Sequence, residues 1–342
     1  MSINNLDINA SIKQQLIKAR ITEVSSLFSL TIYELKEKVS LNESSLKELL
    51  SVAANYLLKS SIKTAYSIHT NEEYKHHKLS TGCELVDQCL HGGIIFPGVT
   101  EICGESASGK TQLCLQLCLN ALISDSYSSV LYICTEDAFP MKRLQQMSEN
   151  IVKRIPCAAP TILTDRMFIE HTAELDDLWT LLNIKVDLLL SNQKIKLIVL
   201  DSVAALFRAE YDASNMINRS QMLAKFGLKL HHISQKYKIC FVVVNQVSDD
   251  FNSLKSVDAF GSKKVVPALG LTWSYMVSTR ILLSRTDLTC AMFQSNQTGK
   301  EQKSYDSVVR SLKVLHAPHL PQVICHFIVD EEGVKDFKLP DN

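Results

Sequence analysis

Zinc-ligand spacing, a secretory signal and membrane-spanning runs are all missing from this 342-residue chain. Its ten cysteines form no Cys-x-x-Cys pair, so a zinc site is not expected, and a disulfide framework does not suit a chain of this size. The N-terminus is polar, and no apolar run approaches the roughly 18 residues that span a bilayer. Several cysteines lie in apolar runs, where a free thiol behaves as a small hydrophobe: Cys103, Cys114, Cys118, Cys134 and Cys240. We therefore expect a soluble protein in a reducing, intracellular compartment, with no membrane partner.

An excess of charge of either sign is also missing, because Lys and Arg total 36 and so do Asp and Glu. Zero net charge argues against a bulk electrostatic attraction to nucleic acid, although a local basic patch can still bind one. At 46% hydrophobic and 21% charged, the chain can bury a sizeable core and is not disordered. Its length suits a large α/β domain with a small appendage.

Glycine and proline are absent from residues 1–58, which we interpret as a small helical lobe. Two segments, Thr31-x-x-Glu34 and Ser45-x-x-Glu48, have the capping-box form, in which each side chain binds the other's free backbone amide at a helix start. Apolar residues then recur at helical spacing. The polar residues 59–78 that follow predict a solvated linker.

From residue 79 to residue 342 the pattern changes to short β-branched runs that alternate with helical stretches. Near-continuous apolar runs suit strands of a parallel sheet that is covered on both faces. They cover residues 99–103, 130–134, 167–170, 197–200 and 240–244, with helical patterns at 111–122, 174–190 and 220–235. This alternation predicts an α/β fold with a doubly wound, mostly parallel sheet. Three closer runs suggest hairpins added at the edge of the sheet, at 280–283, 312–315 and 325–329.

A phosphate-loop motif lies between an expected strand and an expected helix, which is the context that the motif requires. It comprises Gly104, Glu105, Ser106, Ala107, Ser108, Gly109, Lys110 and Thr111. The two glycines permit a tight path whose amides converge on phosphate oxygens, and the helix N-terminus adds a partial positive charge. Lys110 would contact the β- and γ-phosphates, and the Thr111 hydroxyl would bind Mg²⁺. The motif therefore predicts a site for ATP and Mg²⁺.

Acidic side chains follow two of the expected strands. Asp201 would face Thr111 and hold Mg²⁺ through the water shell of the ion, or it is an ordinary aspartate at a strand end. Glu136 would orient the attacking water, since a central phosphate-loop strand would place the neighbouring strand's end beside the γ-phosphate. Asp137 is the alternative base, and both acids could simply solvate a loop.

A pair of amides, Asn245 and Gln246, follows a third apolar run. An amide there could hydrogen-bond the γ-phosphate and act as a sensor, or the pair could be satisfied polar groups that end a strand. The next residues, 248–266, have no periodicity, and a long structureless loop inside a compact domain is usually functional or mobile. Its lysines suit phosphate contacts and equally suit a solvated loop: Lys255, Lys263 and Lys264.

Three motifs in this order resemble those of the RecA-like strand-exchange recombinases of eukaryotes. They are Gly-Glu-x-x-x-Gly-Lys-Thr-Gln at 104–112, Tyr-Ile-Cys-Thr-Glu-Asp-x-Phe at 132–139, and Leu-Asp-Ser at 200–202 with Asn-Gln after the next apolar run. Residues 134–147 and 317–321 resemble more narrowly the paralogues of these recombinases. The resemblance covers essentially the whole chain. It implies a RecA-like ATPase core at 79–342 and a small N-terminal helical domain.

The resemblance also implies a role for each residue that matches a family motif. These are Lys110 and Thr111 at the triphosphate and Mg²⁺, Gln112 in the same loop, Glu136 as the water-orienting base, Arg143 stacked on adenine, Asp201 as the acid beside Mg²⁺, and Gln246 as the γ-phosphate sensor. The two loops that face DNA in that family match roughly residues 211–219 and 248–266. Arg208 and Arg219, with the three lysines named above, would then lie near single-stranded DNA.

The same resemblance implies a role for the linker. Ile62-Lys63-Thr64-Ala65 matches a Phe-x-x-Ala segment that inserts into a neighbouring protomer by strand addition. Ile62 in place of the aromatic anchor implies a changed partner, as in a heteromeric paralogue. His316 replaces an Asp in the segment that caps a neighbour's nucleotide. Residues 39–44 lack the glycine with which the family's lobe approaches DNA.

These matches imply a DNA-dependent ATPase subunit of homologous recombination and double-strand break repair, in the nucleus with some protein in the cytoplasm. It would form a heterodimer with a paralogous RecA-like subunit, the paralogue designated C, and would support recombinase filaments on single-stranded DNA. The alternative is an ATP-gated structural adaptor with little need for hydrolysis, which the altered Ile62 and His316 favour. A ring-forming helicase motor would share the core but would not explain the N-terminal lobe and the docking segment.

Overall fold

The computed structural model describes residues 2–28, 30–39, 41–58, 64–70, 77–154, 163–210, 215–249, 265–290 and 307–339. The chain divides into two compact units, Met1–Lys75 and His76–Asn342. Within the described ranges, no helix is both long enough and apolar enough to cross a membrane. The cysteines in those ranges are free thiols and nearly all are buried, as their places in apolar runs predict.

The first unit is built from short helices around a leucine-rich core. Its elements are η1 (Ile3–Asn5), α1 (Ala10–Lys18), η2 (Ser25–Leu27), α2 (Ile32–Lys38), α3 (Glu43–Leu58) and α4 (Ala65–Thr70). Apolar residues at helical spacing, among them Leu35, Leu46 and Leu49, turn one face of α1, α2 and α3 into this core, whereas α4 has no buried residue. Helix α4 lies inside the stretch predicted to be a linker, where Thr64 Oγ1 accepts a hydrogen bond from the Ser67 amide at 3.1 Å.

The two capping-box predictions for this unit have different outcomes. Thr31 Oγ1 accepts from the Glu34 amide at 3.2 Å, and the Glu34 carboxylate accepts from the Thr31 amide at 2.7 Å, so the first box is confirmed. The second box, at Ser45 and Glu48, is wrong. Asn42 Oδ1 accepts from the Ser45 amide at 2.8 Å, so α3 begins at Glu43 and Ser45 already lies in its first turn.

A nine-stranded sheet forms the centre of the second unit, in the order β13-β12-β11-β10-β3-β7-β6-β4-β5. The strands are β3 (Gly98–Gly104), β4 (Ser129–Cys134), β5 (Met167–His171), β6 (Ile195–Asp201), β7 (Cys240–Asn245), β10 (Thr279–Thr289), β11 (Val308–His316), β12 (Ile324–Asp330) and β13 (Gly333–Asp336). From β5 to β10 the neighbouring strands are parallel, and β10 to β13 form an antiparallel meander at one edge. The predicted α/β class, the mostly parallel sheet and the edge hairpins are confirmed.

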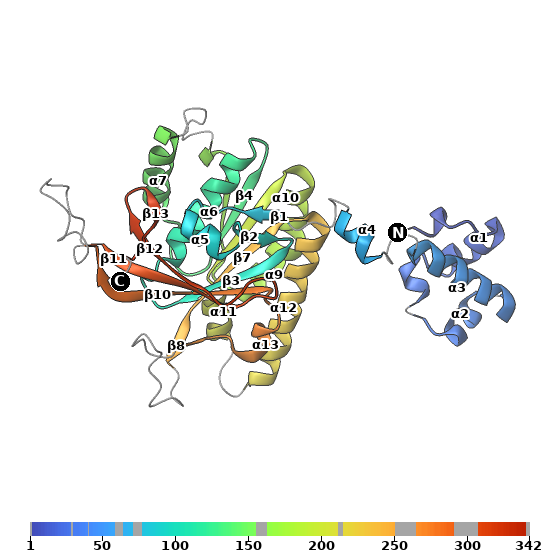
Figure 1. The fold of residues 1–342 in the computed structure, drawn as a ribbon. Coiled ribbons are helices and arrows are strands. Elements are labelled where there is room, and N and C mark those ends of the chain that lie inside the picture. The colour runs from blue at the N-terminus through green and yellow to red at the C-terminus, as the bar shows by residue number, and fades with distance from the viewer. Residues whose placement is uncertain are drawn as a thin grey trace, which may run out of the picture. The chain divides into compact units, whose positions relative to one another are not determined.

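Helices cover both faces of this sheet (Figure 1). Side chains along β4 alternate between two cores, with Val130 and Tyr132 in one and Leu131 and Ile133 in the other. The first face carries α5 (Glu84–Cys89), α6 (Lys110–Ser124) and α7 (Met141–Arg154). The second carries α9 (Leu175–Thr180), the π-helical turn η4 (Leu181–Lys185), α10 (Val186–Asn192), α11 (Val203–Glu210), α12 (Met216–Tyr237) and α13 (Gly270–Ser274).

The phosphate-loop strand is central as predicted, but its predicted neighbour is wrong. Strand β3 lies between β7 and β10. The strand that leads to Glu136, β4, is separated from β3 by β6 and β7. The crossover from β3 through α6 to β4 passes over two positions that later strands fill. Local sequence patterns do not encode that choice, because each strand looks equally suited to either position.

Two small antiparallel sheets lie outside the main one. Strand β1 (His77–Leu79) pairs with β2 (Ile94–Phe96), so the last part of the predicted linker belongs to a strand. Strand β8 (Val247–Asp249) pairs with β9 (Val265–Pro267). The ends of the stretch expected to be structureless are therefore strands. The three lysines between them, Lys255, Lys263 and Lys264, lie outside the described residues.

Candidate functional site

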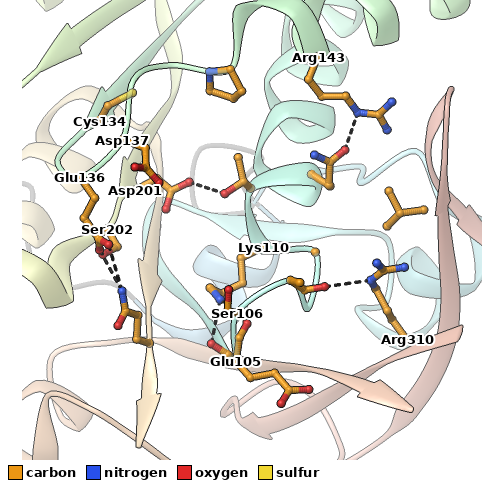
Figure 2. Close-up of a pocket in the computed structure, with 18 of the residues that line it drawn as sticks. Glu105, Ser106, Lys110, Cys134, Glu136, Asp137, Arg143, Asp201, Ser202 and Arg310 are labelled. Atoms are coloured by element: carbon orange, nitrogen blue, oxygen red, sulfur yellow. Dashed lines mark hydrogen bonds between the residues drawn. The ribbon is translucent and has the colours of Figure 1, made fainter. Parts of the chain in front are cut away.

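A cavity of about 870 Å³ opens at the carboxyl ends of the parallel strands. Ligands bind at this edge of open α/β sheets. The lining comes from segments that are far apart in the sequence, namely the phosphate loop, the turn after β4, the ends of β6 and β7, and strands β11 and β12. Figure 2 shows side chains from these segments around one space.

The phosphate loop connects β3 to α6 along one wall of this cavity. At Gly104 a Cβ would stand 2.3 Å from the carbonyl oxygen of Leu283, so only glycine lets β10 approach so closely. Gly109, with a φ of 102°, is the N-cap of α6 and has no side chain that could accept from the first-turn amides. Those amides are therefore available to an anion.

Lys110 lies against the loop that precedes it. Its Nζ donates to the carbonyl oxygens of Gly104 at 2.8 Å and Glu105 at 2.6 Å. Burial lowers the pKa of Lys110, and the nearby Asp201 carboxylate opposes that effect. An ammonium that is partly withdrawn from water, beside free amides, is a donor set that fits the oxygens of a phosphate chain.

The structure brings Asp201 and Thr111 together. Thr111 Oγ1 donates to Asp201 Oδ2 at 2.8 Å, and Tyr132 Oη donates to the same oxygen at 2.7 Å. Burial raises the pKa of Asp201, whereas the two hydroxyls and Lys110 lower it. A carboxylate next to a hydroxyl is an oxygen set that fits Mg²⁺. Tyr132 is a site residue that the sequence reasoning missed, and the available signal was a lone phenol in the apolar run 130–134.

Glu136 and Gln246 also meet, although their strands are not arranged as expected. Gln246 Nε2 donates to the two carboxylate oxygens of Glu136 at 3.0 and 3.2 Å. Ser202 Oγ donates to the same carboxylate, and Arg208 Nη2 donates to Gln246 Oε1. These four side chains form a continuous line of hydrogen bonds along the ends of β4, β6 and β7. Asp137 lines the cavity too, so it is still an alternative base.

The residues expected at docking and DNA contacts are spread over the molecule. Arg208, expected beside a DNA-facing loop, is linked to the cavity through its hydrogen bond to Gln246. Arg219 on α12 is half-buried and donates through Nη2 to the Ala268 carbonyl oxygen at 3.4 Å. Ala65 is exposed at the start of α4, His316 is exposed at the end of β11, and Ile62 lies outside the described residues.

Two arginines complete the lining on the side of β11 and β12 (Figure 2). Arg143, from α7, donates through Nε to Gln112 Oε1 at 2.6 Å. Its Nη atoms donate to the backbone carbonyl oxygens of Asp330 and Glu331. Arg143 and Gln112, both expected at the nucleotide, are thus in direct contact. Arg310, from β11, was missed, because a single arginine within a strand belongs to no recognisable motif.

The sequence of the chain matches DNA repair proteins over most of its length. A sequence model of the Rad51 family matches residues 74–337. The chain is similar to the DNA repair protein XRCC3 of Mus musculus, which is 33% identical over 354 residues, with 98% of each chain covered. The DNA repair protein XRCC3 homolog of Arabidopsis thaliana is 34% identical over 284 residues, which cover 75% of this chain and 92% of that protein. The DNA repair protein rhp57 of Schizosaccharomyces pombe is 27% identical over 373 residues, covering 98% and 99%.

Proposed function

The chain belongs to the Rad51 family, and on this premise we propose that it is an XRCC3-like paralogue that binds ATP and acts in recombinational DNA repair. Its relatives named above are DNA repair proteins. Its finer role is that of a DNA-dependent ATPase subunit in double-strand break repair, which supports recombinase filaments on single-stranded DNA. It acts in the nucleus, with some protein in the cytoplasm.

The observation that supports this proposal most strongly is the convergence of Lys110, Thr111, Glu136, Asp201 and Gln246 on one cavity. Phosphoryl transfer needs cations and amides for the phosphate oxygens, oxygen ligands for Mg²⁺, and a group that orients water. The five residues supply each of these, and they come from the start of α6 and from the ends of β4, β6 and β7.

In the proposed site, the phosphate oxygens bind Lys110 and the first-turn amides of α6. Thr111 and Asp201 hold Mg²⁺, which when bound neutralises the charge that develops on the phosphates. The Tyr132 hydroxyl orients the Asp201 carboxylate so that it can hold the metal ion. The fit of this site to Mg²⁺ rests on the hydrogen bonds that Thr111 and Tyr132 donate to Asp201 at 2.8 and 2.7 Å.

Hydrolysis in the proposed site depends on Glu136. Its carboxylate orients the attacking water and takes up a proton, while Ser202 and Gln246 hold the carboxylate in place. Gln246 is in turn bound by Arg208, which lies just before residues 211–219. A nucleic acid that engaged Arg208 would therefore change how Glu136 is held, which is a direct route from DNA to the rate of hydrolysis.

We also propose a heterodimer with a paralogous Rad51-family subunit, the paralogue designated C, that cooperates with the strand-exchange recombinase. The docking segment is Ile62 to Ala65, and Ala65 has the exposure that such a residue needs. Single-stranded DNA would be contacted by side chains in the two loop regions and just before the first of them: Arg208, Arg219, Lys255, Lys263 and Lys264.

A second candidate function is an ATP-gated adaptor, in which bound nucleotide orders an interface and hydrolysis has little importance. The hydrogen bonds of Glu136 favour it. Both carboxylate oxygens of Glu136 accept hydrogen bonds from Gln246, and one accepts from Ser202 as well, so the acid is engaged by the protein itself. The changed anchor at Ile62 and the exposed His316 point the same way.

Replacement of Glu136 by Gln tests the proposal, with Asp137→Asn as the matched control. In the complex with its partner, Glu136→Gln keeps the shape of the side chain but removes the base. We expect steady-state ATP turnover to fall roughly 10²- to 10⁴-fold while ATP binding persists, and we expect Asp137→Asn to change turnover little. The opposite pattern would make Asp137 the base. Normal repair in cells that carry only a turnover-dead Glu136→Gln protein would leave the adaptor as the function.

A further inference from the structure

Arg310 reaches the nucleotide cavity from a strand that lies far from the phosphate loop in the sequence. It belongs to β11 and lines the cavity beside the loop. Its Nε donates to the Ala107 carbonyl oxygen at 3.4 Å, and its Nη1 donates to the Val308 carbonyl oxygen at 3.0 Å. A Cβ built on Gly109 would lie 3.4 Å from the Cδ of Arg310, so the side chain lies directly against the loop.

The charge of Arg310 has no carboxylate partner within the described ranges. The acceptors of its hydrogen bonds are backbone carbonyl oxygens. Burial lowers the pKa of Arg310, and so does Arg285, which lies opposite it in the β10–β11 ladder. A half-buried cation beside a second cation costs free energy unless an anion offsets it. This unfavourable charge lies where the cavity has room for an anionic ligand.

Arg143, in the same cavity, has different surroundings (Figure 2). It is bound by the side chains of Gln112 and Gln146 and by two backbone carbonyl oxygens. Burial lowers its pKa, but the carboxylates of Asp330 and Glu331 oppose that effect. Its positive charge is therefore partly offset by the protein, which suits a neutral ring system better than a phosphate.

We propose that Arg310 binds the phosphate chain of the nucleotide, whereas Arg143 serves its base. The assignment rests on the proposed function, because it requires a nucleotide in the cavity. A guanidinium presents several N–H donors in a fixed plane, and a phosphate accepts two of them at once. The Nε bond to Ala107 is long and only the Nη1 bond to Val308 has a normal length, so the guanidinium can give up the Ala107 contact to a phosphate at little cost.

The competing explanation is that Arg310 merely supports the phosphate loop through Ala107. The two roles differ in what they predict for the protein without ligand. A supporting arginine stabilises the empty protein, so its removal lowers the melting temperature. An arginine reserved for phosphate adds a half-buried charge without a carboxylate partner to the empty protein, so its removal leaves the melting temperature unchanged or raises it.

The test compares Arg310→Gln, Arg310→Lys and Arg143→Gln by calorimetric titration of the full-length protein, in the complex with its partner, with Mg²⁺-ADP and with Mg²⁺-pyrophosphate. We expect Arg310→Gln to weaken the binding of both ligands about tenfold to a hundredfold, the range for hydrogen bonds to charged groups. Arg310→Lys keeps the charge and is expected to recover part of the loss. Arg143→Gln is expected to weaken ADP but not pyrophosphate, since pyrophosphate has no base.

Two outcomes would overturn the assignment. One is wild-type affinity of Arg310→Gln for both ligands, and a lower melting temperature of that variant without ligand would then make Arg310 a support of the loop. The other is a loss of ADP binding with normal pyrophosphate binding, which would move Arg310 to the base. If the wild-type complex binds neither ligand, the proposed function itself fails, which these two outcomes do not imply.

Discussion

Glu101 lies in the middle of strand β3, and Lys110 follows the phosphate loop after that strand. These two charged side chains have different kinds of partner. Glu101 is fully buried, and its carboxylate accepts from Asn245 Nδ2 at 2.6 Å, from Trp273 Nε1 at 2.9 Å and from the guanidinium of Arg280. We call Glu101 and Arg280 the closed pair. Lys110 and Arg310 donate to backbone carbonyl oxygens and form no ion pair with a described carboxylate, and we call them the open cations.

This difference distinguishes charges that stabilise the fold from charges that are available to a ligand. The closed pair satisfies its charges within the protein, and it connects β3 to β7, β10 and α13. Asn245 directly precedes Gln246, so the closed pair also fixes the end of β7 from which Gln246 enters the cavity. The open cations lie where an anion can reach them. Loss of a closed charge should therefore affect folding, and loss of an open cation should affect binding.

Glu101→Gln gives the largest expected effect on stability. It removes the negative charge but keeps the shape, so Arg280 is left buried without its partner. We expect the free energy of unfolding to fall by about 3 to 5 kcal/mol, measured by denaturant titration. Glu105→Gln, at an exposed acid in the phosphate loop, is the control, with an expected change well below 1 kcal/mol. Equal effects of the two substitutions would erase the distinction between closed and open charges.

Lys110→Met tests the other side of the comparison. It removes an open cation, so we expect the affinity for Mg²⁺-ADP to fall about tenfold to a hundredfold while the ligand-free melting temperature changes little. Lys153→Met, at an exposed lysine on α7, should leave both quantities unchanged. A large loss of ligand-free stability in Lys110→Met would show that Lys110 belongs with the closed charges.

Tyr132→Phe removes only the hydroxyl that donates to Asp201. We expect a loss of about 1 kcal/mol in the free energy of unfolding, typical of one hydrogen bond, and a few-fold higher Mg²⁺ requirement for ADP binding. Tyr127→Phe, at an exposed tyrosine, is the matched control with no expected change. An unchanged Mg²⁺ requirement in Tyr132→Phe would rule out orientation of Asp201 by this hydroxyl.

Thr31→Ala gives the smallest expected effect and extends the comparison to the N-terminal unit. It removes a satisfied polar pair that is open to water, so we expect a loss of only about 1 kcal/mol or less in the stability of that unit. Ser45→Ala should change its stability even less, because Asn42 and not Ser45 caps α3. Circular dichroism during denaturant titration compares the two variants, and a larger loss for Ser45→Ala would restore the rejected capping box.

Much of the fold could be predicted because its signals are local. The phosphate loop, the apolar strands and the capping box at Thr31 each depend on residues that are close in the sequence. Asp201 could be placed near Thr111 because carboxyl ends of parallel strands meet at one edge of a sheet. The RecA-like class then followed from the order of the motifs, and the match to the Rad51 family confirms it.

What could not be predicted depends on contacts between distant segments. The order of β7, β6 and β4 beside β3 depends on how whole strands and helices pack together, and the residue pattern of a single strand does not reveal it. Arg280 and Glu101 form an ion pair between two strands that are far apart in the sequence. The contact of Arg310 with the phosphate loop also joins two distant segments. Arg208 was assigned by its nearness to a loop in the sequence, whereas its side chain bonds to Gln246.

The most direct test of the central claim, that the open cations mark a nucleotide site, is the melting temperature of the purified protein complex over a range of Mg²⁺-ATP concentrations. Binding to the folded state stabilises it by about 2.7 kcal/mol at a hundred times the dissociation constant, so the melting temperature should rise with the logarithm of concentration. The rise should be smaller at every concentration in Lys110→Met and Arg310→Gln. A wild-type melting temperature that does not change at saturating Mg²⁺-ATP would contradict the account.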